Sequence, residues 1–246
     1  MFGVIGGTGI YRLMDPEEEL RVETPYGTVE VGLTHIGKTK VYLLARHGKK
    51  HELPPHLVNY RANIWALHSL GVERILSTSA VGSMVPEIRP GELVYVRDVI
   101  DLTSGRERTF FDEPVHVDFT DPLCPQINSL LEREYRGVVY VCTNGPRFET
   151  PAEIRAYTLL GGEVVGMTLA PEVFLAREKA MCYSSVSIVT NYAAGIKGKK
   201  LTIDEVLEVT REKEEEIRTL FSKLISELKG MKRTCPCPKA LDGATL

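Results

Sequence analysis

The segment FGVIGGTG at residues 2–9 gives the first indication of the fold. Phe2 to Ile5 form a short apolar run that ends in Gly6-Gly7-Thr8-Gly9, a pattern typical of a buried strand followed by a tight turn. Backbone N–H groups in such a turn can hold an anion as large as phosphate. The third glycine of a dinucleotide-binding fingerprint is absent, so this loop by itself only weakly supports a dinucleotide oxidoreductase.

Strand-like and helix-like segments alternate along the rest of the chain. Further strands are expected at 29–31, 40–45, 74–79, 92–99, 138–143, 163–167 and 184–190, and helices at 55–71, 126–135, after 150, from about 171, and from 202 to 230. About nine strands and about six helices in this order predict an α/β fold. We expect a single-domain, three-layer fold with a central mixed, twisted β-sheet flanked by helices. The expected domain covers residues 1–229, followed by a tail at 230–246.

Composition narrows the classes of partner. The chain has 246 residues, a formal net charge of -3 and 43% hydrophobic residues, which fit one large domain. No broad positive field is available to attract nucleic acid or an anionic membrane. The N-terminus lacks a basic segment, and no stretch of 18 apolar residues occurs. These features favour a cytoplasmic protein that binds small molecules.

The five cysteines fall into two groups. Cys124, Cys142 and Cys182 lie singly in or beside apolar segments, as buried thiols do. Cys235 and Cys237 form a Cys-Pro-Cys in the tail with no second cysteine or histidine pair near them in the sequence. A four-ligand zinc site from this tail alone is therefore not expected, and a disulfide clip is favoured. Such a disulfide, together with one Gln and five Asn in the chain, points to a thermophilic source.

Groups suited to binding an anion follow several predicted strands. They are Thr8, the pair Arg46-His47, the pair Ser79-Ala80, and the pair Met167-Thr168. Open α/β sheets bind ligands at the carboxyl ends of their strands, so we expect these groups to share one site. Taken singly, Arg46 and His47 could equally cap a strand or pair with a surface carboxylate.

Seven motifs occur in the order found in a known family: GVIGGTGI, ARHG with a following HxxPP, VNYRANIWAL, SAVGS, RPGEL, GPRFET and GMTLAPEV. From Phe2 to about Leu228 the chain resembles the methylthioadenosine and methylthioinosine phosphorylase branch of the purine nucleoside phosphorylases. The resemblance implies a pentosyltransferase that uses inorganic phosphate as co-substrate, with no other cofactor and no metal. It assigns phosphate binding to Thr8, Arg46, His47, Ser79, Ala80 and Thr168, places Met167 against the ribose, and implies a homotrimer or a dimer of trimers.

The residues at the base site distinguish this chain from methylthioadenosine enzymes. Asn191-Tyr192-Ala193 replaces a D-Y-D-like segment that suits a 6-amino group. The Asn191 amide can bind N7 and donate to O6 of a 6-oxopurine, and the Glu149 carboxylate can accept the N1–H that such a base carries. Phe148 can stack on the base. Read alone, Glu149 could instead be a favourable charge at a helix N-terminus.

The donor is indicated by the start of the last helix. Relatives that cleave ordinary nucleosides carry a His there in an H-x-E-V pattern, whereas this chain has Ile203 and Val206. These side chains suit a methylthio group, although ordinary core packing would also explain them. His116 lies in a long excursion, residues 103–125, which resembles the segment that reaches a neighbouring subunit's 5′ pocket. We expect S-methyl-5′-thioinosine as substrate, with inosine or guanosine, methylthioadenosine, and a non-catalytic purine binder as alternatives.

Overall fold

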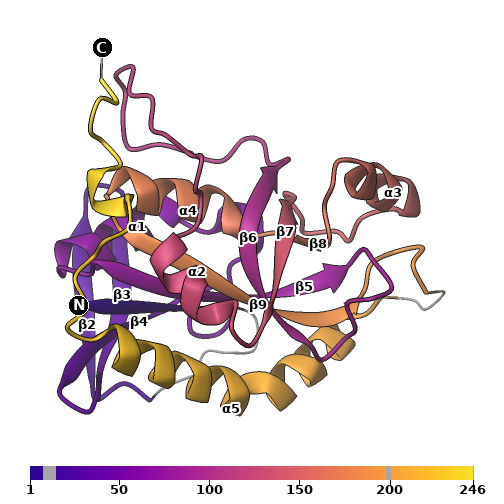
Figure 1. Cartoon of the computed structure of the whole chain (residues 1–246), viewed down its shortest axis with the longest axis horizontal. Helices are drawn as coiled ribbons and strands as arrows, with labels where there is room; N and C mark the ends of the chain where they lie inside the picture. The colour runs from indigo at the N-terminus through magenta and orange to yellow at the C-terminus, as the bar shows by residue number, and fades with distance from the viewer. Residues whose placement is uncertain (8–14, 198–200, 246) are drawn as a thin grey trace.

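The computed structural model describes residues 1–7, 15–197 and 201–245. Within them, nine strands form one mixed sheet in the order β2-β3-β4-β1-β5-β8-β7-β6-β9 (Figure 1). The strands are β1 Phe2–Gly6, β2 Glu18–Thr24, β3 Gly27–Ile36, β4 Thr39–Ala45, β5 Arg74–Ser83, β6 Leu93–Asp101, β7 Arg136–Cys142, β8 Val164–Gly166 and β9 Cys182–Tyr192. The expected α/β fold with a mixed central sheet is confirmed.

One half of the sheet closes on itself. β5 pairs with β1 through Arg74–Ser77, with β8 through Gly82 and Ser83, and with β9 along its whole length. Because β8, β7, β6 and β9 are also paired in succession, these five strands form a ring. Strands β4, β1, β5 and β9 pair in succession and run parallel to one another, so their carboxyl ends meet at one edge.

Helices cover the sheet on two sides. α1 (Tyr60–Ser69) and α4 (Leu169–Glu178) contribute to one hydrophobic core, and α2 (Pro125–Leu131) and α5 (Ile203–Leu228) to another. α5 lies along the lower side of the sheet in Figure 1, and α3 (Pro151–Leu159) lies at the end near β8. Thr202 caps α5 by accepting the Glu205 N–H, as the sequence pattern predicts.

Three expectations need correction. The described segments contain five α-helices and two short 3₁₀ helices, η1 (Pro55–Leu57) and η2 (Cys237–Lys239), in place of about six helices. The helix expected from residue 55 begins only at Tyr60, because Asn59 caps it by accepting the Ala62 N–H. Only part of β3, at residues 29–31, is predicted from the sequence, and its hairpin partner β2 is not. The exposed, charged residues of β2 give it no clear strand pattern.

The long excursion and the tail project together from the sheet (Figure 1). Residues 102–124 contain no helix or strand apart from an isolated bridge between Val115 and Thr245. The His116 N–H also donates to the Ala244 carbonyl, 2.8 Å away. Among the described helices, none has the length and apolar character needed to cross a membrane.

Candidate active site

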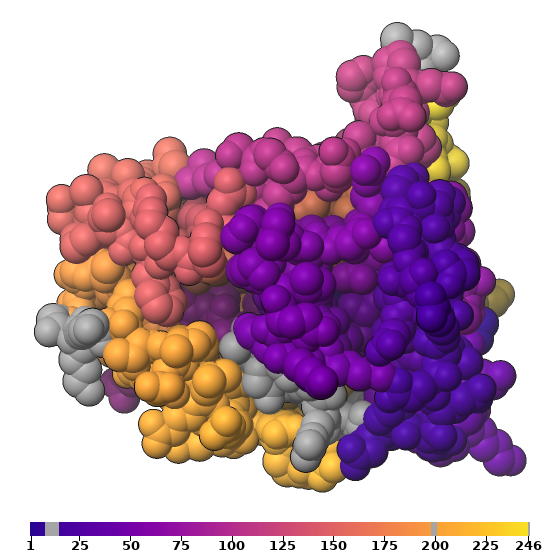
Figure 2. Space-filling model, turned by 180° about the vertical axis from the view of Figure 1, so that it is seen from behind, coloured from indigo at the N-terminus to yellow at the C-terminus, as the bar shows by residue number. Residues whose placement is uncertain are grey.

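A cavity of about 410 Å³ opens where the parallel strands end. Figure 2 shows the molecule hollowed on this face, between the purple, salmon and orange segments. Twelve of the predicted site residues line the cavity: Arg46, His47, Ser79, Ala80, Phe148, Glu149, Met167, Thr168, Asn191, Ala193, Ile203 and Val206. Thr8 lies outside the described residues. His116 is exposed on the projecting excursion and is not part of the lining.

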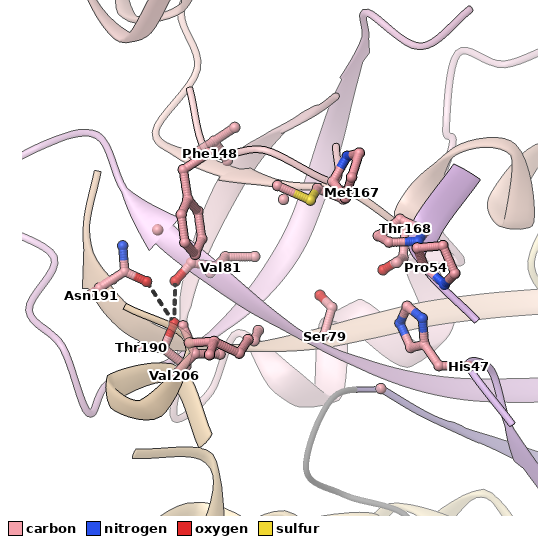
Figure 3. Close-up of a pocket in the computed structure, with 18 of the residues that line it drawn as sticks. His47, Pro54, Ser79, Val81, Phe148, Met167, Thr168, Thr190, Asn191 and Val206 are labelled. Carbon is pink, nitrogen blue, oxygen red and sulfur yellow. Dashed lines mark hydrogen bonds between the residues drawn. The ribbon is translucent and has the colours of Figure 1, made fainter. Parts of the chain in front are cut away.

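The lining has two chemically different ends. Figure 3 shows His47 and Thr168 at one end, Asn191 and Phe148 at the other, and Ser79 and Met167 between them. The first end offers polar groups from strand ends and the start of α4. The second combines an amide with an aromatic ring. The cavity can therefore hold an anion and a flat heterocycle at the same time, joined by a group beside Met167.

Arg46 is anchored below the anion end rather than extended into it. Its Nε and Nη2 donate to the two oxygens of Glu172 at 2.6 and 2.7 Å, while Nη1 donates to the Thr78 carbonyl and Nη2 also to Ser77 Oγ. Arg46 is 1% exposed and Glu172 is fully buried. Burial alone would lower the pKa of Arg46, but the Glu172 carboxylate raises it above the usual value.

The assignment of Arg46 to phosphate stays a prediction, and the structure adds that two of its N–H groups bind Glu172. The acceptors in the described part of the chain leave one Nη1–H of Arg46 available for a further acceptor such as phosphate. Sequence reasoning missed Glu172, although a glutamate inside the apolar run LAPEVFLA is a signal for a paired buried charge.

His47 is held as a neutral imidazole. Its Nδ1 lies 2.8 Å from the Leu53 carbonyl, which can only accept, so Nδ1 carries the proton. Burial and then the charge of Arg46 lower the pKa of His47 to about 4. Nε2 is thus an acceptor near neutral pH, suited to the O–H of hydrogenphosphate.

Ser79, Ala80 and Thr168 complete the anion end. Ser79 Oγ lies 3.1 Å from Ser187 Oγ, and Ala80 is next along β5. Thr168 occupies the N-cap position of α4 but its side chain does not cap the helix. Because the backbone is extended at Ala170, the regular turns of α4 begin after it, and the group that Thr168 presents to the cavity is its uncommitted hydroxyl.

Asn191 is fixed by its neighbours at the other end. Its Oδ1 accepts a hydrogen bond from Thr190 Oγ1, 2.8 Å away (Figure 3). Its Nδ2 donates to the Tyr192 carbonyl at 3.0 Å. These contacts use one lone pair and one N–H, which leaves a second acceptor and a second donor position on the amide. Thr190 was not predicted as a site residue. Its only sequence signal is a hydroxyl at the end of an apolar strand.

Glu149 is the acidic group of the base end. Thr143 donates to its Oε1 at 2.7 Å. Burial raises the pKa of Glu149 above its ordinary value, and the Thr143 hydrogen bond opposes this only partly. The helix-cap role that Glu149 could have had belongs to Thr150 and Glu153, which form a capping box at the start of α3. Glu149 is therefore free of that structural task.

Arg106, in the excursion, supports both ends of the cavity, and the sequence analysis did not identify it as a site residue. Arg106 donates to four backbone carbonyls, those of Thr143, Asn144, Met167 and Ala170, at 2.6 to 3.3 Å. Their segments carry Glu149 and Thr168. Arg106 thus positions the two sides of the cavity relative to each other.

Comparison with known proteins identifies this arrangement. The phosphorylase superfamily profile matches residues 1–226. The chain belongs to the phosphorylase superfamily. The 6-oxopurine nucleoside phosphorylase of Pyrococcus furiosus is 51% identical over 98% of both chains. A probable S-methyl-5′-thioinosine phosphorylase of Methanopyrus kandleri is 50% identical, again over 98% of both.

Solved structures of the superfamily agree with the fold. The methylthioadenosine phosphorylase of Schistosoma mansoni in complex with adenine superposes with a TM-score of 0.92 and 30% identity, over 99% of this chain and 96% of that one. The predicted family, its branch and its class, a pentosyltransferase, are confirmed. Homology also supports purine nucleoside phosphorylase activity in this chain.

Proposed function

We propose that this protein cleaves 6-oxopurine nucleosides with inorganic phosphate and prefers S-methyl-5′-thioinosine, releasing hypoxanthine and 5-methylthioribose 1-phosphate. The observation that carries the proposal is that a fixed amide, Asn191, and the partly buried carboxylate of Glu149 line the same end of the cavity. An ionised carboxylate accepts the N1–H of a 6-oxopurine and repels the bare N1 of adenine. Similarity to 6-oxopurine and methylthioinosine phosphorylases supports the same choice.

In the proposed reaction, a phosphate oxygen attacks C1′ as the bond from C1′ to N9 breaks. The transition state resembles an oxocarbenium ion, with negative charge moving onto the purine. The proton of hydrogenphosphate ends on the released base, so charge and atoms balance. His47 accepts the phosphate O–H, Arg46 and Thr168 hold the anion, and Asn191 stabilises the leaving base at N7 and O6. No covalent intermediate and no cofactor are required.

Phosphate-dependent release of base tests the activity itself. Purified protein is incubated with S-methyl-5′-thioinosine, inosine, guanosine and methylthioadenosine, with and without phosphate, and free base is quantified. We expect turnover only with phosphate and the highest kcat/KM for methylthioinosine. Binding without turnover would instead support a non-catalytic purine binder. Equal turnover without phosphate would contradict phosphorolysis.

Ile203→His tests the assignment of the 5′ pocket. Ile203 begins α5 and lines the cavity with Val206, so both present apolar surface to the 5′ substituent. A histidine there can bond the 5′-hydroxyl of inosine, a gain of roughly 1 kcal/mol. We expect the ratio of kcat/KM for inosine to that for methylthioinosine to rise about fivefold or more. Leu201→Val, which keeps this wall apolar, is the control and should leave the ratio close to that of the wild type.

Base selectivity should depend on pH through Glu149. Its pKa is raised in the folded protein, so the ionised form that accepts N1–H is present above that pKa and lost below it. The ratio of kcat/KM for methylthioinosine to that for methylthioadenosine should therefore fall as the pH drops through the pKa of Glu149. Taking the ratio removes the titration of phosphate, which both reactions share. In Glu149→Gln the ratio should be lower and independent of pH, and a variant that retains the wild-type slope would exclude this role.

A further inference from the structure

Four cysteines meet at a point remote from the cavity. Cys124 is the N-cap residue of α2, Cys182 is the first residue of β9, and Cys235 and Cys237 lie in the tail. Their Sγ atoms all lie within 4.8 Å of one another, and those of Cys182 and Cys235 are 3.4 Å apart. The fold thus brings together residues that are up to 113 positions apart in the chain (237 − 124).

The spacing of the sulfurs suits a shared ion better than paired disulfides. Tetrahedral zinc with Zn–S bonds of about 2.3 Å places its sulfur ligands about 3.8 Å from one another. A disulfide requires about 2.05 Å, and all five cysteines of this chain are free thiols, which corrects the expected clip between Cys235 and Cys237. The expectation against zinc considered the tail alone, whereas Cys124 and Cys182 supply the second pair of ligands.

The surroundings also suit a structural metal. Cys124, Cys182 and Cys237 are at most 1% exposed and belong to the hydrophobic core beneath α2 and α5. A closed site of four soft ligands with no room for water is typical of structural zinc. Without an ion, four neighbouring thiols, three of them buried, would be poor hydrogen-bonding partners for one another.

We propose that Cys124, Cys182, Cys235 and Cys237 bind one zinc ion that fastens the C-terminal tail to the domain. The four thiols lose four protons on binding, which leaves a zinc tetrathiolate with a formal charge of minus two. No oxidant or reductant takes part.

The contacts on both sides of the cluster show what the ion holds. Before it, Arg74 donates to the Met231 carbonyl at 2.6 Å, and Gln126 donates to the Lys232 carbonyl at 2.9 Å. After it, the tail reaches the excursion, where Ala244 accepts from the His116 N–H. The zinc thus fixes the C-terminal tail, and the tail in turn contacts the excursion that carries His116.

β9 carries Cys182 of the cluster at its start and Asn191 of the base site near its end, so the two sites are far apart. Cys182 and Asn191 are separated by nine positions of β9 (191 − 182), or about 30 Å along an extended strand. The ion is too far away to polarise substrate. Its expected effects are on stability and on the order of the tail.

Metal analysis and mass spectrometry of the full-length protein test the site. Protein purified without chelators is expected to contain about one zinc per chain by inductively coupled plasma mass spectrometry. Its denatured, unreduced mass should equal that of the fully reduced chain. A mercurial reagent should release the zinc to a colorimetric chelator, and this measurement does not depend on any variant folding.

Variants locate the ion. Cys235→Ser combined with Cys237→Ser should lose the zinc and lower Tm, whereas Cys142→Ser should retain it, because Cys142 is buried outside the cluster. Three results would each overturn the proposal. They are protein without bound zinc, a mass lower by two hydrogens for each disulfide, and zinc that persists in the tail variant.

Discussion

Asn191→Ala is expected to lower kcat for phosphorolysis of methylthioinosine by about 10²-fold or more, the effect of deleting one preorganised charge-stabilising donor. The amide meets the purine where negative charge develops as the bond to N9 breaks. Thr190 and the Tyr192 carbonyl hold it in place before substrate arrives, so no reorganisation is needed during the reaction. Alanine removes the donor and leaves the backbone of β9 unchanged.

The kinetic constants separate this role from a structural one. KM for phosphate should stay near its wild-type value in Asn191→Ala, because the anion end is formed by other residues. Tyr192→Phe is the matched control: it changes the adjacent side chain, whose hydroxyl contacts Pro86 and Lys197 outside the anion end, and should keep nearly full activity. A near-normal kcat in Asn191→Ala would remove this residue from the mechanism.

Much of the fold can be predicted from the sequence because the buried strands are nearly continuous apolar runs. β1, β5 and β9 are buried over almost their full length, and each is recognisable by composition. The strand order and the closure of the ring cannot be predicted this way. Closure depends on β5 bonding to β1 at one end and to β8 at the other, and no local pattern encodes a change of partner.

The candidate site was predictable to the extent that its residues lie in or directly after the carboxyl-terminal halves of parallel strands. Parallel strands bring their carboxyl ends to one edge, which explains why Arg46, Ser79 and Asn191 line the same cavity. The supporting residues were missed because their importance depends on distant partners. Arg106 binds carbonyls at least 37 positions away, and Glu172 pairs with Arg46 across 126 positions. The cysteine cluster was missed for the same reason.

Arg46→Met and Glu172→Met are each expected to destabilise the protein by about 3–5 kcal/mol, because each leaves one charge of a buried pair without its partner. Both side chains are at most 1% exposed, and two hydrogen bonds join them directly. The double variant should recover most of this loss, since a buried ion pair replaced by apolar side chains of similar volume is often close to neutral. Ser77 and Tyr183 remain 2.8 Å apart and keep each other as partners. Urea denaturation of all four proteins measures the coupling.

Phosphate affinity should follow a different pattern across the same four proteins. Loss of one charged hydrogen bond to the anion raises KM for phosphate about ten- to hundredfold in both proteins that lack Arg46. Glu172→Met retains the guanidinium and should bind phosphate far better than either, despite its low stability. Stability would then depend on the pair and substrate binding on Arg46 alone. If KM for phosphate instead followed stability across the cycle, Arg46 would be a structural residue, and the anion would have to be held by His47, Thr168 and the neighbouring strand ends.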